Sequence, residues 1–159
     1  MNIQRKEKGF TIIEVVLVLA IAGLIFLMVF IALPALQRNQ RDTARKNDAS
    51  TVAAAVNSFK SNNRGSLSNL TSTRLTQYID KLDQYDMTSS DQVVYVGTQN
   101  TANPSLEQIT VRKGRKCGNA PAPGSSYTTA NGTSRTAAVI VRLENNGASD
   151  GYQMYCVDV

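Results

Sequence analysis

The chain has 159 residues, which is enough for one domain and too short for two of ordinary size. Its formal charge of +5 is mildly basic and is not that of a histone-like protein. Histidine is absent, so the chain lacks the side chain that most often serves as a general base near neutral pH and the commonest nitrogen ligand of metals. Its two cysteines fit no zinc pattern. We therefore expect no enzyme, no cofactor and no metal site.

The first nine residues, MNIQRKEKG, are short and carry a net charge of about +2, and an apolar stretch follows them directly. An ordinary signal peptide has an apolar region of only about 7–15 residues, with its cleavage site after that region, so this arrangement excludes one. Residues 15–36 are 22 positions without a charge. As a helix they reach about 33 Å, enough to cross a hydrocarbon core of about 30 Å. Hydropathy alone does not distinguish a simple membrane anchor from a membrane helix with a more specific role.

Glu14 lies inside this apolar stretch. A carboxylate costs roughly 2.5–3.5 kcal/mol at the centre of a membrane helix and somewhat less near its end. An acid in such a place calls for a partner of opposite charge.

The sequence KGFTIIE at residues 8–14, preceded by a charged leader and followed by an apolar span, resembles the prepilin motif of type IV pilins and the related pseudopilins. The wider resemblance in hydrophobic pattern extends to about Leu36. It implies that a membrane-embedded prepilin peptidase cuts between Gly9 and Phe10 and that the new amino group of Phe10 is methylated. It also assigns Thr11 and Glu14 to assembly.

Cleavage after Gly9 would leave a positive amine on Phe10, four residues before Glu14. A neighbouring subunit shifted along a filament could bring its own amine against this acid, and a subunit out of step would leave a buried charge unpaired. Pairing of Glu14 with the amine of its own chain is the alternative, and the sequence leaves both open. Since a residue without a side chain can enter a peptidase groove closely, we expect a bulkier residue at position 9 to block processing.

Gly23 and Pro34 interrupt an otherwise strong helix pattern, because glycine weakens a helix and proline removes one of its hydrogen bonds. In pilin-like proteins such positions are associated with local melting of the helix in the filament. A tolerated kink in a membrane helix is the other interpretation.

After Leu36 the composition becomes polar, and helix potential continues to the stop at residues 62–65. Val52, Val56 and Phe59 recur at helical spacing and predict an apolar face that packs on a sheet. We expect the basic residues of this stretch to point outward: Arg38, Arg41, Arg45 and Lys46.

The remaining chain predicts a small helix within residues 66–90 and four strands, at residues 92–97, 108–113, 136–143 and 152–157. An antiparallel meander is the expected arrangement, and the turn-rich residues 144–151 would close a hairpin between the last two strands. Four aspartates lie at positions 80, 83, 86 and 91, but they lack the spacing and the central glycine of a calcium loop.

Cys117 and Cys156 could form a disulfide in an oxidising compartment, and many pilins close a C-terminal loop in this way. Two free buried thiols are the alternative. The sequence between them, rich in Pro, Gly, Ser and Thr at residues 118–134, is expected to be exposed.

Four cations stand next to Cys117, and they are a candidate site for DNA or acidic glycans: Arg112, Lys113, Arg115 and Lys116. No aromatic residue is interleaved with them for stacking on single strands, so sequence-specific binding is not expected. A solubilising turn is the other interpretation.

The sequence thus predicts an α+β, type IV pilin-like fold, in which a long hydrophobic-then-amphipathic N-terminal helix packs on an antiparallel sheet of about four strands. We expect a cleaved cytoplasmic leader (1–9), a transmembrane and filament-core helix (10–36), its amphipathic continuation (37–64) and a globular head (65–159).

The expected function is that of a pilin, a membrane precursor that polymerises into an extracellular type IV pilus for adhesion, twitching motility or DNA uptake. Its expected partners are copies of itself, the prepilin peptidase, and the inner-membrane assembly platform with its ATPases. Two alternatives remain: a pseudopilin of a type II secretion or competence system, and a membrane-anchored binding module that does not polymerise.

Overall fold

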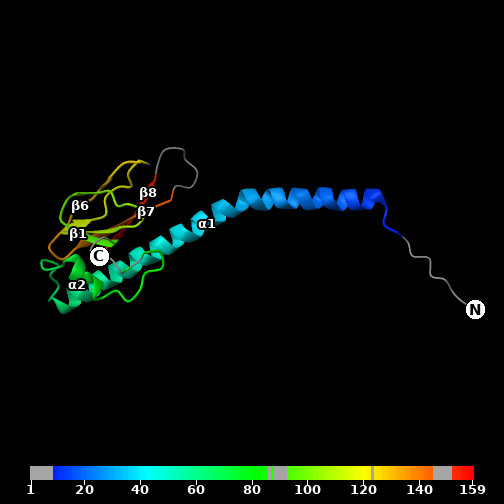
Figure 1. Ribbon diagram of the computed structural model, residues 1–159. Helices are drawn as coiled ribbons and strands as arrows, with labels where there is room; N and C mark the ends of the chain where they lie inside the picture. The colour runs from blue at the N-terminus through cyan, green and yellow to red at the C-terminus, as the bar shows by residue number, and fades with distance from the viewer. Residues whose placement is uncertain (1–8, 86, 88–92, 123, 145–151) are drawn as a thin grey trace, which may run out of the picture. The chain divides into compact units, whose positions relative to one another are not determined.

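The computed structural model describes residues 9–85, 87, 93–122, 124–144 and 152–159 of the chain. Its first and longest helix, α1, runs over Ile12–Asn62 (Figure 1). The chain divides into two units between Gln37 and Arg38. The apolar part of α1 belongs to the first unit. The rest of α1 and all later elements form the second, here called the head unit.

Helix α1 ends where the sequence predicts a stop. The amide of Asn63 donates to the carbonyl of Phe59, and the amide of Gly65 donates to the carbonyl of Lys60. Arg64 and Gly65 have φ angles of 53° and 81°, in the left-handed region that glycine adopts without steric cost. This left-handed turn satisfies the last carbonyls of α1 and reverses the chain.

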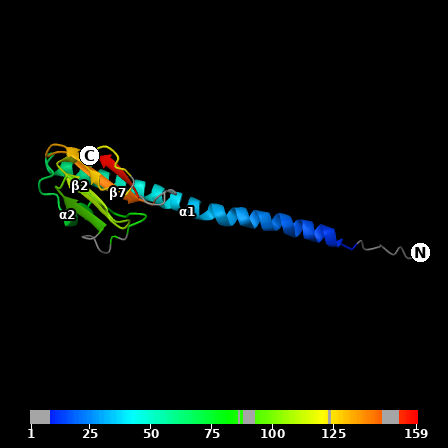
Figure 2. The same cartoon turned by 90° about the horizontal axis from the view of Figure 1, so that it is seen from above.

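A four-stranded sheet lies along the C-terminal part of α1 (Figures 1 and 2). It consists of β1 (Val94–Gly97), β3 (Ile109–Lys113), β7 (Ala137–Leu143) and β8 (Gln153–Asp158), in the order β1-β3-β7-β8. Each strand falls within one of the four predicted runs or extends it by one residue. The α+β class, with a long helix packed on a sheet of about four strands, is therefore confirmed.

The predicted meander is wrong for one pair of strands. β1 and β3 run parallel, with Val94 opposite Ile109 and Val96 opposite Val111, while β3–β7 and β7–β8 are antiparallel. Parallel neighbours need a crossover rather than a tight hairpin. The connection from Gly97 to Ile109 provides it, since it first forms a short strand, β2 (Thr101–Ala102), that pairs outside the sheet. The chain then re-enters the sheet in the direction of β1.

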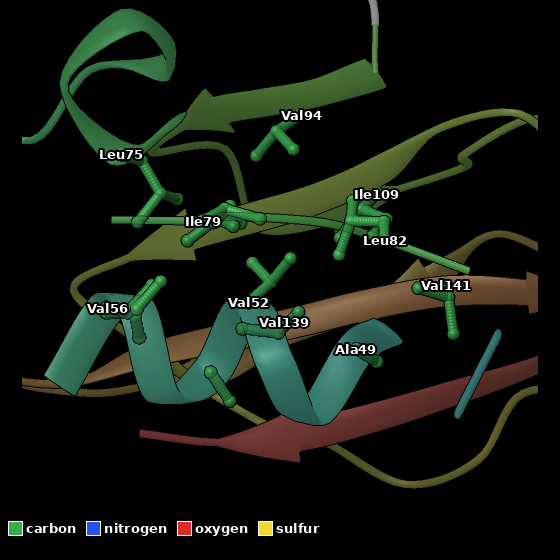
Figure 3. Packing of buried hydrophobic residues seen from close by; sticks show 14 of the residues in the cluster. Ala49, Val52, Val56, Leu75, Ile79, Leu82, Val94, Ile109, Val139 and Val141 are labelled. Atoms are coloured by element: carbon green, nitrogen blue, oxygen red, sulfur yellow. The ribbon is translucent and has the colours of Figure 1, made fainter. Parts of the chain in front are cut away.

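The core lies between α1 and one face of the sheet. Figure 3 shows Val52 and Val56 of α1 close to Val139 of β7, with Ile109 and Val141 nearby. All five are fully buried, and burying such a side chain stabilises a fold by about 1.5–3 kcal/mol. The apolar face predicted from helical spacing is confirmed, and it fixes the sheet against α1.

The segment between α1 and the sheet contributes the other side of this core. Its helix, α2, covers Ser72–Thr76, within the range where the sequence predicts a small helix. The hydroxyl of Thr71 accepts from the amide of Arg74 and caps it. Leu75, Ile79 and Leu82 point into the core (Figure 3). Burial of these three side chains attaches the described part of the segment to the core.

Two short ribbons pack on the face of the sheet that points away from α1. β5 (Tyr127–Thr128) pairs with β2, and β6 (Ala130–Asn131) pairs with β4 (Arg115–Lys116). Tyr127 is 3% exposed and packs with Ile140 of β7. The prediction that residues 118–134 form an exposed loop is therefore wrong in part, because this segment supplies a second small core.

Candidate functional site

The predicted cleavage motif lies at the start of the described chain. Gly9, Phe10 and Thr11 precede α1, which begins at Ile12. The amide of Glu14 donates to the carbonyl of Thr11 over 3.1 Å, which closes the first turn. Phe10 is 83% exposed. The bond between Gly9 and Phe10 thus lies in irregular, exposed backbone, which a peptidase can bind in extended form.

No contact within the chain explains glycine at position 9. A Cβ atom built on Gly9 would meet no atom within 4 Å. A requirement for glycine there would have to come from another molecule, such as the peptidase proposed below. Residues 1–8, which include Lys8 of the motif, lie outside the described residues.

Glu14 occupies the first turn of α1, where the helix dipole favours a negative charge. Its carboxylate has no hydrogen bond or ion pair with any described residue. An open groove beside it is lined mainly by apolar side chains: Phe10, Val15, Val18 and Leu19. Pairing within the chain and pairing between chains both remain predictions.

The apolar part of α1 has no cover within its unit. Its large apolar side chains, from Phe10 to Leu36, are all 44% or more exposed. In the described part of the chain, α1 is the one helix long and apolar enough to cross a membrane. So much exposed apolar surface on a helix indicates a membrane or other protein chains as its surroundings.

Gly23 and Pro34 both lie inside α1, which the structure assigns as helix throughout. A Cβ atom on Gly23 would meet nothing within 4 Å, so packing within the chain does not require this glycine. Pro34 cannot donate to the carbonyl four residues earlier. Their role in weakening the helix stays a prediction.

A cluster of charges that sequence reasoning missed joins α1 to the end of β7. Both carboxylate oxygens of Glu144 accept from Arg41, over 2.8 and 2.6 Å, and one also accepts from Arg45 over 2.9 Å. Asp42 accepts from the amide of Glu144 over 2.7 Å and from Arg45 over 3.2 Å. These hydrogen bonds, chiefly those from Arg41, lower the pKa of Glu144 to about 2. We call these four residues the Glu144 cluster.

The Glu144 cluster corrects the expectation that the basic residues after Leu36 all point outward. Arg45 is 7% exposed and is enclosed by the head unit. One turn further along α1, Asp48 is buried and accepts from the amides of Asp83 and Gln84, each over 2.8 Å. Burial raises the pKa of Asp48, against the effect of these two hydrogen bonds. Buried charges therefore anchor both β7 and the segment after α2 to α1.

The predicted basic site is divided by the structure. Arg112 is 7% exposed, lies 5.3 Å from the ring centre of Tyr95 and donates to Gln99 over 2.7 Å. It faces away from α1, whereas Lys113 donates to the carbonyls of Ser68 and Leu70, over 2.9 and 3.0 Å. The two side chains are thus on opposite faces of β3 and do not act together.

The other two cations of the predicted site lie on β4. Arg115 donates to the side chain of Asn131 over 2.6 Å and to the carbonyl of Thr98 over 3.4 Å. Lys116 is exposed. The role of these residues in binding an anion stays a proposal.

The two cysteines form a disulfide, with their Cα atoms 5.9 Å apart. Cys156 lies on β8, and Cys117 directly follows β4. The amide of Cys117 also donates to the carboxylate of Asp158 over 2.6 Å. The disulfide therefore links the start of the segment that forms the second small core to β8, the edge strand of the sheet.

Within the described residues, no group of three His, Cys, Asp or Glu side chains is placed to hold a metal ion. Of the aspartates considered for calcium, Asp80 and Asp83 belong to the described chain, and those at positions 86 and 91 lie outside it.

Comparisons with known proteins place the family signature in the N-terminal segment. The family model described as the prokaryotic N-terminal methylation motif matches residues 4–30. The comparisons with curated proteins and with solved structures give no match. The match spans the cleavage motif, Glu14 and most of the apolar part of α1, and thereby identifies the chain as carrying the signature of the type IV prepilin-type proteins.

Proposed function

We propose that this chain is a pilin, a structural subunit that polymerises into a type IV pilus on the cell surface. The observation that carries the proposal is the apolar part of α1, which bears the methylation motif at its start and has no cover in its own unit. Such a surface fits a membrane before assembly and neighbouring helices afterwards. The pilus would serve adhesion, twitching motility or DNA uptake.

The subunit itself has a structural rather than a catalytic role. A prepilin peptidase removes residues 1–9 on the cytoplasmic side, and Phe10 becomes the methylated N-terminus. The inner-membrane assembly platform and its ATPases then extract the subunit from the membrane into the growing filament. The free energy of assembly comes from packing the apolar helices, and the work of extraction comes from the ATPases.

Glu14 is proposed to set the register between subunits. Its carboxylate has no partner in the described chain, and the amine of Phe10 in a neighbouring subunit would supply one. In apolar surroundings the loss of one member of an ion pair leaves an uncompensated charge and costs about 3–5 kcal/mol. A subunit at the wrong height would lose the pair, whereas membrane insertion does not depend on it.

The substitution Glu14→Ala tests this role. We expect the variant to insert into the membrane and to be cleaved after Gly9, but to form no surface filaments under the electron microscope. A matched control is Glu107→Ala, which removes an exposed acid of the head unit and should leave the filament count unchanged. Normal filaments from Glu14→Ala would refute the register role. Very short fibres from the unaltered chain would instead favour a pseudopilin.

A further inference from the structure

Exposed cations gather at the end of the head unit where α1 ends. Arg64 belongs to the left-handed turn after α1, and the side chain of Arg135 lies over the backbone of the next residue, Gly65. Both arginines are exposed. Arg74, also exposed, donates to the carbonyl of Asn69 over 3.4 Å. Chain segments far apart in sequence therefore bring positive charge to one surface.

A shallow depression on this surface is bordered by two further cations, Lys113 and Arg115. It is lined by Leu67, Ser68, Thr98, Lys113, Gly114 and Ser134. Lys113 forms part of its wall. Arg115 donates to the carbonyl of Thr98, and Arg135 follows Ser134 directly. The basic surface is defined here as Arg64, Arg74, Lys113, Arg115 and Arg135.

No described carboxylate forms an ion pair with the basic surface. The three ion pairs found among the described residues all belong to the Glu144 cluster, at the opposite end of β7. Asp158, at the end of β8, accepts from the amide of Cys117. The hydrogen bonds of Lys113, Arg74 and Arg115 go to neutral oxygens, so the positive charge of the surface is not cancelled.

We propose that the basic surface binds double-stranded DNA through its phosphates, without reading the base sequence. Duplex DNA carries one negative charge per about 1.7 Å, so each phosphate that a cation neutralises releases counterions. Four of the five residues are arginines, whose planar guanidinium groups match the oxygens of a phosphate in pairs. None of the six residues lining the depression is aromatic. The depression therefore offers no aromatic side chain on which single-stranded bases could stack.

This site differs from the run of four cations visible in the sequence. Arg112 is excluded, since it is buried on the opposite face of β3. Arg64, Arg74 and Arg135 are added, although the first two lie about 40–50 residues before that run and the third about 20 after it. Binding would belong to each subunit, so it does not depend on polymerisation.

The test uses the full chain in micelles of an uncharged detergent. Its binding to a fluorescent duplex of about 24 base pairs is measured by anisotropy at several KCl concentrations. We expect log K to fall linearly with log [KCl], with a slope near −0.9 for each phosphate contacted. We also expect equal affinity for duplexes of unrelated sequence. A preference for one sequence, or no dependence on salt, would overturn the proposal.

The double variant Arg64→Gln with Arg135→Gln removes two exposed cations of the basic surface. We expect the salt slope to become smaller by about 1.8 and the affinity at low salt to fall at least about tenfold. The control is Arg38→Gln with Lys81→Gln, which removes the same charge from exposed positions outside the basic surface.

Equal losses in the two double variants would show that net charge rather than this surface binds DNA, and would overturn the assignment. Thermal unfolding of each variant verifies that the head unit is folded. Competition with polygalacturonate, a polyanion without phosphate, tests whether binding requires phosphate groups or only negative charge. If it displaces the duplex at equal charge concentration, the surface binds polyanions in general, and the assignment to the phosphates of DNA is wrong.

Discussion

The two parts of α1 have the same backbone structure, but their apolar side chains differ in where they find cover. From Phe10 to Leu36 the large apolar side chains are 44% or more exposed. Between Ala49 and Phe59 the buried ones are 5% exposed or less. The second stretch finds its partner in the chain's own sheet. The first has none in its unit, which indicates a membrane or other protein chains as its surroundings.

This difference shows that the sequence of one helix specifies two kinds of contact. In the part of α1 that belongs to the head unit, apolar side chains recur at helical spacing among polar ones, because only one face of the helix contacts the sheet. In the apolar part almost every side chain is hydrophobic, which is the pattern of a helix whose faces all lie away from water, as in a membrane. The stability of the head unit should therefore be insensitive to substitutions before Gln37.

Removing one phenylalanine from each part of α1 tests whether the two parts contribute differently to the stability of the head unit. Phe59 is 2% exposed and packs edge-on against Tyr78, whereas Phe26 is 65% exposed. We expect Phe59→Ala to lower the free energy of unfolding of the head unit by about 3–5 kcal/mol, because it leaves a cavity. Phe26→Ala should change it by less than about 0.5 kcal/mol. Denaturant titration in uncharged micelles, followed by near-UV circular dichroism, measures both.

The comparison fails if Phe26→Ala destabilises the head unit as much as Phe59→Ala does. Such a result would mean that the two parts of α1 fold as one cooperative unit.

The disulfide should stabilise the head unit alone, since both of its cysteines lie in that unit. Replacing Cys117 and Cys156 by serine opens a loop with a sequence separation of 39. In the chain-entropy account this lowers the free energy of unfolding by about 4 kcal/mol. Chemical reduction of the unaltered protein serves as the control and should give a similar loss. No measurable change in the midpoint of denaturation would contradict the prediction.

The smallest expected effect concerns Glu144 and depends on pH. Its pKa in the folded chain is about 2, below the ordinary value of 4.5, chiefly because of the hydrogen bonds from Arg41. A lowered pKa stabilises the fold above about pH 4.5, and this contribution is lost as pH falls toward 2. Glu144→Gln should therefore lower the free energy of unfolding near pH 7 by about 1–3 kcal/mol. The two proteins should converge near pH 2.

Comparing the two proteins at each pH separates Glu144 from the other acids. Asp48, whose pKa is raised by burial, contributes in the opposite sense, since its protonation favours the folded state as pH falls. It is present in both proteins and cancels in their difference. A difference between them that stays constant from pH 7 to pH 2 would rule out the assigned role of Glu144.

The sequence was sufficient for features that local pattern determines. The spacing of Val52, Val56 and Phe59 predicted the face of α1 that meets the sheet, and residues 62–65 predicted its end. The four strand runs followed from β-branched and aromatic residues. The direction of β1 relative to β3 did not follow, because the alternation of side chains is the same in parallel and antiparallel strands.

Some of the missed residues had a weak signal in the sequence. Extending the apolar face of α1 backward by three or four residues from Val52 reaches Asp48 and then Arg45, so both could have been placed on the buried side. Alternation along β3 sets Arg112 on the face opposite to Val111 and Lys113. By contrast, nothing local connects Arg41 with Glu144, which lie 103 residues apart.

The intact mass of the protein in sheared surface filaments would decide whether the chain is a processed and polymerised pilin. The proposal predicts a chain that begins at Phe10, lacks residues 1–9, carries one added methyl group on its amine and comes from fibres visible by electron microscopy. A chain that retains Met1 and is recovered outside the cell as a soluble monomer would contradict it.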